Sequence, residues 1–336
     1  MKILNKIKVP TGYICIAEGS KGKLEFLSIG DYGKDKNVKA DFMGINRDIE
    51  GVPNGEIMPL TEKWVITIST QYGCSMKCNF CDVPLVGRGI NATALDLEYE
   101  IIEGLKLFPE IKATKRLNIH FARMGEPTFN FNILKIAYGL QDIIRPYIGN
   151  SLIHPVVSTM LPKRNKKLIE FLNTWAIDIK NNRFRGCAGL QLSINSTNDI
   201  QRNKMFGGCS LSLTEISDIG KNLPIPVGRK YALNFALADD YEVNAERLKN
   251  LFNPEKFMVK ITPLHLTKSC KNNKIRTSNG YNKFTPYKKI EEDLKSVGFD
   301  VLVFIPSYDE DLSRITCGNA ILSGSKPFDF SILDYN

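Results

Sequence analysis

From residue 64 onward, short apolar runs alternate with longer amphipathic stretches. The apolar runs predict strands at Trp64–Ile68, Leu117–Phe121, Pro155–Thr159, Leu190–Ile194, Tyr231–Leu237, Phe257–Ile261 and Val301–Ile305. Between them, apolar residues recur three and four positions apart, which predicts helices at Leu95–Phe108, Phe131–Ile144, Lys166–Trp175, Leu213–Asn222, Ala245–Phe252 and Thr285–Val297. Repeated units of this length predict parallel strands with right-handed crossovers, and hence an α/β fold built as an open or closed β/α barrel.

The segment 1–60 has a different pattern. Alternating runs predict strands at Thr11–Ile16, Lys23–Leu27 and Val38–Phe42, with Gly, Lys and Asp residues at the turns between them. We therefore expect three parts, which are a small β-rich N-terminal appendage over 1–60, a barrel over 61–325 and a C-terminal tail over 326–336.

Composition narrows the class of protein. The chain has 336 residues, of which 43% are hydrophobic and 24% charged, so it can bury a full core. No run approaches eighteen apolar residues and the N-terminus lacks a signal-peptide pattern, so we expect a cytoplasmic protein that does not bind membranes. The eight cysteines are typical of a reducing compartment. A net charge of +9 favours an anionic partner, with nucleic acid first.

Three cysteines follow the first predicted strand of the barrel. Cys74, Cys78 and Cys81 are separated by three and then two residues, and a tight loop can bring their thiols to one centre. Three thiols leave a four-iron cluster one ligand short. A zinc knuckle or buried free thiols are the alternatives, but zinc normally takes four ligands, and His120 is the nearest histidine in the sequence.

This spacing, with Phe80 before the last cysteine, resembles the signature of radical S-adenosylmethionine (SAM) enzymes. The resemblance implies a 4Fe–4S cluster whose open iron is chelated by the amino and carboxylate groups of SAM. It also implies a partial (β/α)6 barrel, a monomer, and a flavodoxin- or ferredoxin-like electron donor. In barrels, chemistry gathers at the C-terminal ends of the strands, which is where these cysteines lie in the predicted order.

Polar residues also follow the next predicted strands. Gly125 and Glu126 belong to a Met-Gly-Glu-Pro turn after the second strand, and Ser158, Ser193 and Asn195 lie at the ends of the third and fourth. A carboxylate can hold an ammonium group, and hydroxyl and amide groups can bond a ribose or a carboxylate. The same residue types are equally common as helix caps or in ordinary turns.

In their order, these segments resemble one branch of the radical SAM family, the adenosine C2 methyl synthases of the RlmN and Cfr type. The resemblance covers about Pro59 to Leu322 and includes Ile261-Thr262-Pro263 and an Asp-rich turn that leads to Cys317-Gly318. It implies that Cys317 carries a methyl group and that Gly125, Glu126, Ser158, Ser193, Asn195 and His265 lie at the SAM site. Asn195 stands where the family has a histidine, and His265 where it has an asparagine.

The family's reaction depends on residues that this chain replaces. By resemblance, one SAM methylates Cys317, a second gives a 5′-deoxyadenosyl radical that takes hydrogen from that methyl group, and the carbon radical adds to adenine. A glutamate base and a second cysteine then resolve the protein–RNA crosslink. Thr67 stands in place of that cysteine and Asn54 in place of the glutamate, with Glu56 two residues away. A hydroxyl substitutes poorly for a thiol that must attack sulfur.

Two explanations of these replacements stay open. Another thiol could resolve the crosslink, and the candidates are Cys15, Cys187, Cys209 and Cys270. Otherwise the chain runs a different reaction. Cys15 lies in an alternating strand and is better explained as a small buried hydrophobic residue.

A basic stretch, His265–Arg276, follows the sixth predicted strand. Its Lys and Arg residues could hold phosphates at the catalytic end of the barrel, with Tyr281 or Phe284 stacking a base, or it could be a solvated lid without a ligand.

Our leading hypothesis is a radical SAM enzyme that methylates a carbon of adenine in RNA through Cys317. One alternative takes hydrogen directly from a nucleotide or another small substrate without methyl transfer. Another is an iron–sulfur protein that binds RNA or senses redox state without turnover.

Overall fold

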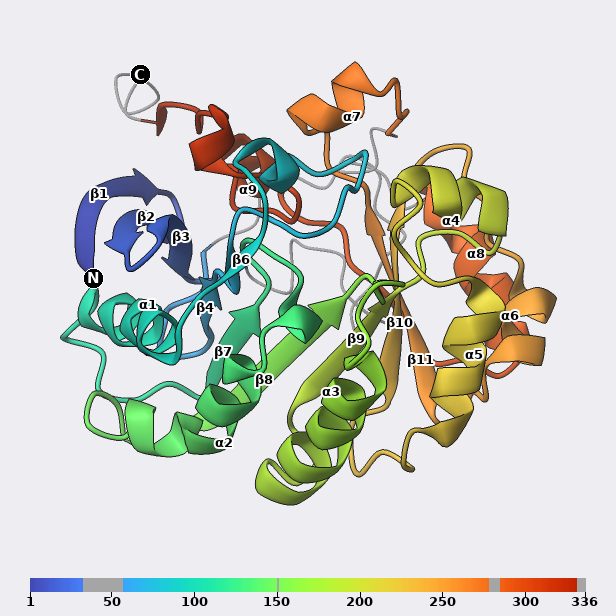
Figure 1. Ribbon diagram of the computed structural model, residues 1–336, viewed down its shortest axis with the longest axis horizontal. Helices are drawn as coiled ribbons and strands as arrows, with labels where there is room; N and C mark the ends of the chain where they lie inside the picture. The colour runs from blue at the N-terminus through green and yellow to red at the C-terminus, as the bar shows by residue number, and fades with distance from the viewer. Residues whose placement is uncertain (33–56, 150, 278–284, 331–336) are drawn as a thin grey trace.

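The computed structural model describes residues 1–32, 57–149, 151–277 and 285–330 (Figure 1). The described residues form one ten-stranded sheet in the spatial order β1-β2-β3-β4-β7-β8-β9-β10-β11-β12. Its parallel part consists of β4 (Trp64–Ile68), β7 (Arg116–Phe121), β8 (Leu152–Thr159), β9 (Gly189–Ser193), β10 (Tyr231–Leu237), β11 (Phe257–Pro263) and β12 (Val301–Val303). Each of the seven predicted strands of the barrel is present. The α/β class with a parallel, open-barrel sheet is therefore confirmed.

Helices follow the strands and cover the outer face of the sheet (Figure 1). The predicted helices correspond to α1 (Ala94–Lys106), α2 (Asn132–Ile144), α3 (Leu168–Thr174), α5 (Leu213–Asn222), α6 (Ala245–Leu251) and α8 (Thr285–Ser296). The third continues as a π-helical stretch over Trp175–Arg183. Short helices that the apolar pattern does not predict are α4 (Asp199–Met205), α7 (Lys268–Asn272) and α9 (Tyr308–Leu312). These are too short to show a full apolar face.

Helices α1 and α5 both begin at capping boxes. Thr93 accepts a hydrogen bond from the amide of Asp96, whose carboxylate accepts one from the Thr93 amide, and Ser212 and Glu215 repeat the arrangement at α5. Each pair satisfies amides that a helix start leaves unpaired.

The N-terminal strands extend the barrel sheet. The hairpin of β1 (Lys2–Val9) and β2 (Gly12–Gly19) continues into β3 (Gly22–Ile29), and β3 pairs antiparallel with β4. The apolar pattern predicted β2 and β3 but not β1, and the expected strand Val38–Phe42 lies outside the described residues. The described part of the appendage is thus continuous with the barrel.

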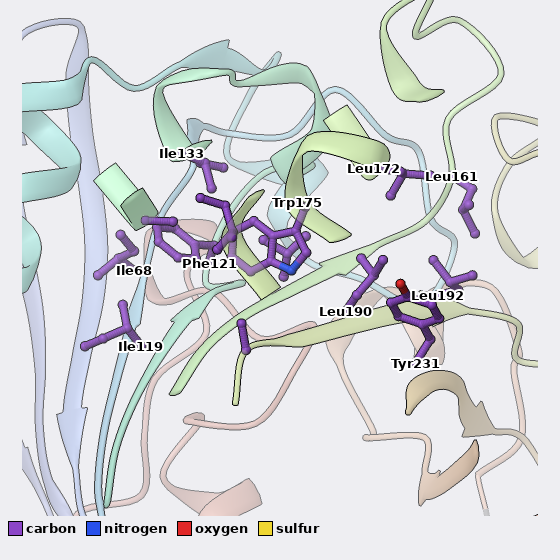
Figure 2. Packing of buried hydrophobic residues seen from close by; sticks show 14 of the residues in the cluster. Ile68, Ile119, Phe121, Ile133, Leu161, Leu172, Trp175, Leu190, Leu192 and Tyr231 are labelled. Carbon is purple, nitrogen blue, oxygen red and sulfur yellow. The ribbon is translucent and has the colours of Figure 1, made fainter. Parts of the chain in front are cut away.

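The main core lies between the sheet and its helices. Alternate side chains of each parallel strand point outward into it, as in Ile68, Phe121, Leu190 and Tyr231 (Figure 2). Trp175 packs edge to face against Phe121, with ring centroids 5.9 Å apart. Because strand side chains alternate, the residues between these face the inside of the barrel.

Candidate functional site

The cysteine loop (residues 73–82) leaves the sheet after β4 and the two-residue strand β5 (Gln71–Tyr72). The Cys78 side chain is buried, whereas Cys74 and Cys81 are partly exposed. Burial raises the pKa of the Cys74 thiol to about 12. Burial and repulsion from neighbouring thiols raise the pKa of Cys78 and Cys81 well above the ordinary value. The loop therefore gathers three thiols whose charges act on one another.

Backbone amides point at these sulfurs. The Met76 amide donates a hydrogen bond to Cys74 Sγ over 3.4 Å, and the Gly125 amide also donates to this thiol. Gly125 has a φ of +95°, and a Cβ there would lie 2.7 Å from the Gln71 backbone nitrogen. Only glycine allows the second loop to approach the first this closely.

Gln71 holds the two loops together. Its Oε1 accepts hydrogen bonds from the amides of Ser75 and Glu126, each at 3.1 Å. Its Nε2 donates to Ser75 Oγ at 3.0 Å and to Asn91 Oδ1 at 2.7 Å. These bonds fix the Met-Gly-Glu-Pro turn against the first cysteine.

Glu126 is buried, and its carboxylate is engaged by the protein. Oε1 accepts hydrogen bonds from the hydroxyls of Thr128 and Thr159 at 2.7 and 2.6 Å, and Oε2 accepts one from the Met160 amide at 2.9 Å. Burial raises the pKa of Glu126, and these hydrogen bonds oppose the shift. Its charge acts on Cys74 and Cys78, so the carboxylate lies near the cysteine loop.

The other predicted cofactor residues lie on neighbouring strand ends. Ser158 alternates with the core-facing Val157 and so faces the barrel interior, and Ser193 ends β9 and is buried. Asn195 has a φ of +59°, accepts a hydrogen bond from the Ala236 amide at 2.9 Å and donates to Met205 Sδ at 3.4 Å. Asn195 therefore already serves as a link between β10 and α4.

Cys317 lies beside the cysteine loop. The carbonyl of Gly318 accepts a hydrogen bond from the Asp82 amide at 2.8 Å, and the charge of Cys317 acts on Cys81. The side chain is exposed, yet the surrounding protein raises its thiol pKa, while Lys260 and Arg123 oppose that shift. The fold thus brings together the N-terminal cysteine motif and the C-terminal cysteine.

His265 lies just after β11 and is buried. Its Nδ1 is 3.6 Å from Asp311 Oδ1, and burial lowers the pKa of its imidazole to about 4, with Asp311 opposing. Thr67 lies on β4, opposite Leu27 of β3 and His120 of β7, and faces the barrel interior. Asn54 and Glu56 lie outside the described residues.

The interior of the barrel is cationic. Burial lowers the pKa of His120 to about 3, and the nearby charges of Lys260, Lys63, Arg229 and Arg116 add to the shift. His120 is therefore neutral at pH 7. Lys260 also acts on His265 and Cys317, so it links the interior with the reactive end.

Sequence reasoning missed several residues that build this site. Thr159, Gln71, Arg123 and Arg202 are buried and hold the site loops through hydrogen bonds. Gln71 and Arg123 directly precede the cysteine motif and the Met-Gly-Glu-Pro turn, but their contacts come from residues distant in the chain. No local pattern predicts such pairings.

The donor set fits a four-iron cluster with one open iron. Three thiols come from one loop, amides donate to Cys74, and Gly125 lets the second loop approach the first closely enough for its amide to reach that thiol. Among the residues that the structure describes, no three Cys, His, Asp or Glu side chains meet closely enough to share one metal ion. The fit therefore rests on the thiols and their hydrogen-bond donors.

The basic stretch contains α7 and lies against the cysteine loop. Thr267 Oγ1 donates to the carbonyl of Phe80 at 2.7 Å, and Asn273 Nδ2 donates to that of Asn79 at 2.8 Å. Lys271 and Lys274 are exposed here. These contacts place the stretch at the end of the barrel where the cysteines lie.

Two curated proteins illustrate what the sequence of this chain is similar to. Dual-specificity RNA methyltransferase RlmN 2 of Myxococcus xanthus is 26% identical over 217 residues, which is 61% of this chain and 53% of that protein. RlmN of Wolinella succinogenes is 25% identical over 205 residues, which is 60% of this chain and 53% of that protein. The chain is similar to RlmN-type RNA methyltransferases. It spans about half the length of these RlmN relatives.

The fold comparison agrees with the RlmN resemblance. A radical SAM methyltransferase from Sphaerobacter thermophilus superposes with a TM-score of 0.59 at 16% identity, covering 90% of this chain and 76% of that one. The chain therefore shares the fold of that protein. No family model matches the chain. In the described part of the chain, no helix is both long and apolar enough to cross a membrane.

Proposed function

We propose that this protein is a radical SAM enzyme that methylates a carbon of an RNA base, most directly adenine, through Cys317. The observation that carries the proposal is the placement of Cys317 next to the cysteine loop, through the bond between Gly318 and Asp82. When bound, a 4Fe–4S cluster with SAM supplies the methyl group and the radical chemistry. The RlmN relatives support RNA as the substrate class.

The chain's own residues divide the work. Cys74, Cys78 and Cys81 would hold the cluster, and Gly125 and Glu126 would bind SAM beside it. The Cys317 thiol would accept the methyl group as a thioether, for which it must first lose its proton. Lys260 and Arg123 favour that loss, because their charges oppose the rise in thiol pKa that the surrounding protein causes.

The test is anaerobic turnover with total RNA, a low-potential flavodoxin or ferredoxin, and SAM carrying a labelled methyl group. We expect labelled methyladenine in the RNA and a methyl group on Cys317 by mass spectrometry. Cys317→Ala should lose both and keep its iron. Cys187→Ala is the matched control, because the Cys187 carbonyl bonds His154 and the residue precedes β9, so this thiol lies away from the cysteine loop and is not placed to resolve the crosslink. An unmodified Cys317 together with unmethylated RNA would overturn the proposal.

A second candidate function has its own support. Thr67 faces the barrel interior where the methyl-transfer reaction would use a resolving thiol. We therefore also consider direct hydrogen abstraction from a nucleotide or another small substrate, with no methyl transfer. SAM with a deuterated methyl group separates the two: deuterium in the product supports methyl transfer, and its absence alongside 5′-deoxyadenosine formation supports abstraction.

A further inference from the structure

A buried ion pair joins the N-terminal strands to the turn that precedes Gly125. Arg123 donates to Glu25 Oε2 from Nε at 3.0 Å and from Nη2 at 2.8 Å. Glu25 on β3 is 0% exposed and Arg123 is 5% exposed. A charge pair this deep persists only where its remaining hydrogen-bonding groups are also satisfied.

Those remaining groups bond the segment that carries Cys317. The Cys317 segment (residues 314–322) begins at Arg314, whose carbonyl accepts a hydrogen bond from Arg123 Nη1 at 3.0 Å. It ends at Leu322, whose amide donates to Glu25 Oε1 at 2.6 Å. The ion pair therefore holds the segment on both sides of the reactive cysteine.

The same pair is attached to the cysteine-loop side of the site. The Arg123 amide donates to the carbonyl of Ile68 at 2.9 Å, at the end of β4. Ser69 Oγ donates to the Glu25 carbonyl at 2.5 Å. The pair thus ties the Cys317 segment to the end of β4, which leads into the cysteine loop.

We propose that Glu25 and Arg123 are positioning residues that hold Cys317 at the site, so the N-terminal strands act as a brace for the reactive thiol. The inference rests on the proposed function for the role of Cys317. It assigns the described part of the appendage to the geometry of the reaction.

The test compares Glu25→Gln with Ser28→Ala. Ser28 lies on the same strand and is equally buried. Its hydroxyl donates to the Gly104 carbonyl and accepts from Trp64 Nε1, so both of its hydrogen bonds lie away from the Cys317 segment. Both changes weaken the attachment of β3. We expect Glu25→Gln to lower methyl labelling of Cys317 at least tenfold, with iron content within twofold of wild type. Ser28→Ala should leave both the labelling and the iron content within twofold.

Hydrogen–deuterium exchange gives a readout that is independent of turnover. In the iron-loaded protein, Glu25→Gln should speed exchange over residues 314–322, and Ser28→Ala should not. If Glu25→Gln does not fold, Arg123→Lys is the second variant. It keeps the charge but cannot reach both Glu25 and Arg314 with one planar group, so we expect the same loss of Cys317 labelling and the same faster exchange over residues 314–322.

The outcomes separate the two proposals. A wild-type protein without methyl on Cys317 overturns the proposed function, and exchange over 314–322 still tests the brace. Normal exchange and normal Cys317 labelling in Glu25→Gln overturn the brace. An equal loss of labelling in Ser28→Ala also overturns it, because the effect is then general destabilisation.

Discussion

At the scale of single residues, Gly125 sets how closely the two site loops approach each other. We expect Gly125→Ala to displace the cysteine loop, because its Cβ would meet Gln71 Cβ at 2.6 Å in a backbone conformation that suits only glycine. Iron content after anaerobic reconstitution should fall several-fold.

Gly139→Ala is the matched control, since nothing lies within 4 Å of its Cβ and it belongs to α2. It should keep its iron and gain about 0.5–1 kcal/mol of unfolding free energy. Normal iron binding in Gly125→Ala would show that the turn can shift without harm.

His154 gives a pH-dependent prediction. Its Nδ1 donates to the Cys187 carbonyl at 3.0 Å, its Nε2 is buried with no partner among the described residues, and burial lowers its pKa to about 4. In the unfolded chain the imidazole of His154 has a pKa near 6.5. Below that pH the unfolded state therefore binds a proton that the folded state does not bind. Folding stability should therefore fall as pH falls from about 6.5 toward 4.

The change His154→Gln removes that loss. Urea unfolding of the anaerobic holoprotein at pH 5.5 and 7.5 should show a smaller drop in the variant, by at most about 1.4 kcal/mol per pH unit. Partial solvent exposure should reduce the difference further. Equal drops in both proteins would contradict a neutral buried His154.

Individual cysteine positions could be predicted because motif spacing is local. One stretch of eight residues contains Cys74, Cys78 and Cys81, so their proximity follows from the sequence alone. In the structure their charges act on one another. Glu126 was expected to hold an ammonium group, but its carboxylate bonds Thr128, Thr159 and Met160. Its role toward SAM stays a prediction. The partners of a buried carboxylate depend on the packing of distant strands, which no spacing reveals.

At the scale of elements, Asp96 joins α1, β5 and the turn between β2 and β3. Its Oδ2 accepts hydrogen bonds from Tyr72 Oη at 2.8 Å, Ser20 Oγ at 3.0 Å and the Thr93 amide at 2.9 Å. Burial disfavours the charged form, yet these bonds hold the pKa of Asp96 below its ordinary value. Three elements therefore share one carboxylate.

We expect Asp96→Asn to cost about 1–3 kcal/mol, because an amide nitrogen would face hydrogen-bond donors. Exchange should rise in residues 19–22 and 70–74 of the anaerobic protein. Ser212→Ala, which removes the cap of α5, should cost about 1 kcal/mol without that local change. Uniform exchange across the molecule would contradict a local role for Asp96.

Strands were easier to predict than their pairing. The apolar pattern places β4 and β10 with their observed bounds, since each is a short apolar run with clear ends. It cannot show that β3 pairs with β4, because pairing depends on which edges remain open after the barrel forms. It also cannot show the π-helical turn at Trp175–Arg183, where one extra residue enters each turn.

At the scale of the whole molecule, the net charge is +9. Lysines in and just after α7 place part of this positive charge beside the site. We expect RNA affinity to fall with rising salt, because bound phosphates release counterions. Lys271→Ser with Lys274→Ser should reduce the slope of log affinity against log salt by about 1.4 for single-stranded RNA.

Lys112→Ser with Lys115→Ser is the control, since both lysines are exposed and precede β7 at the opposite end of its strand. Fluorescence anisotropy at several KCl concentrations gives both slopes. Equal slopes for the two double variants would place the RNA elsewhere.

The link between Glu25 and Leu322 spans 297 residues of sequence. At synthesis rates of about 5–20 residues per second, the carboxylate of Glu25 waits about 15–60 seconds before Leu322 exists. The brace can therefore close only after Leu322 has been made. A newborn chain whose cysteine loop is already complete still lacks a placed Cys317.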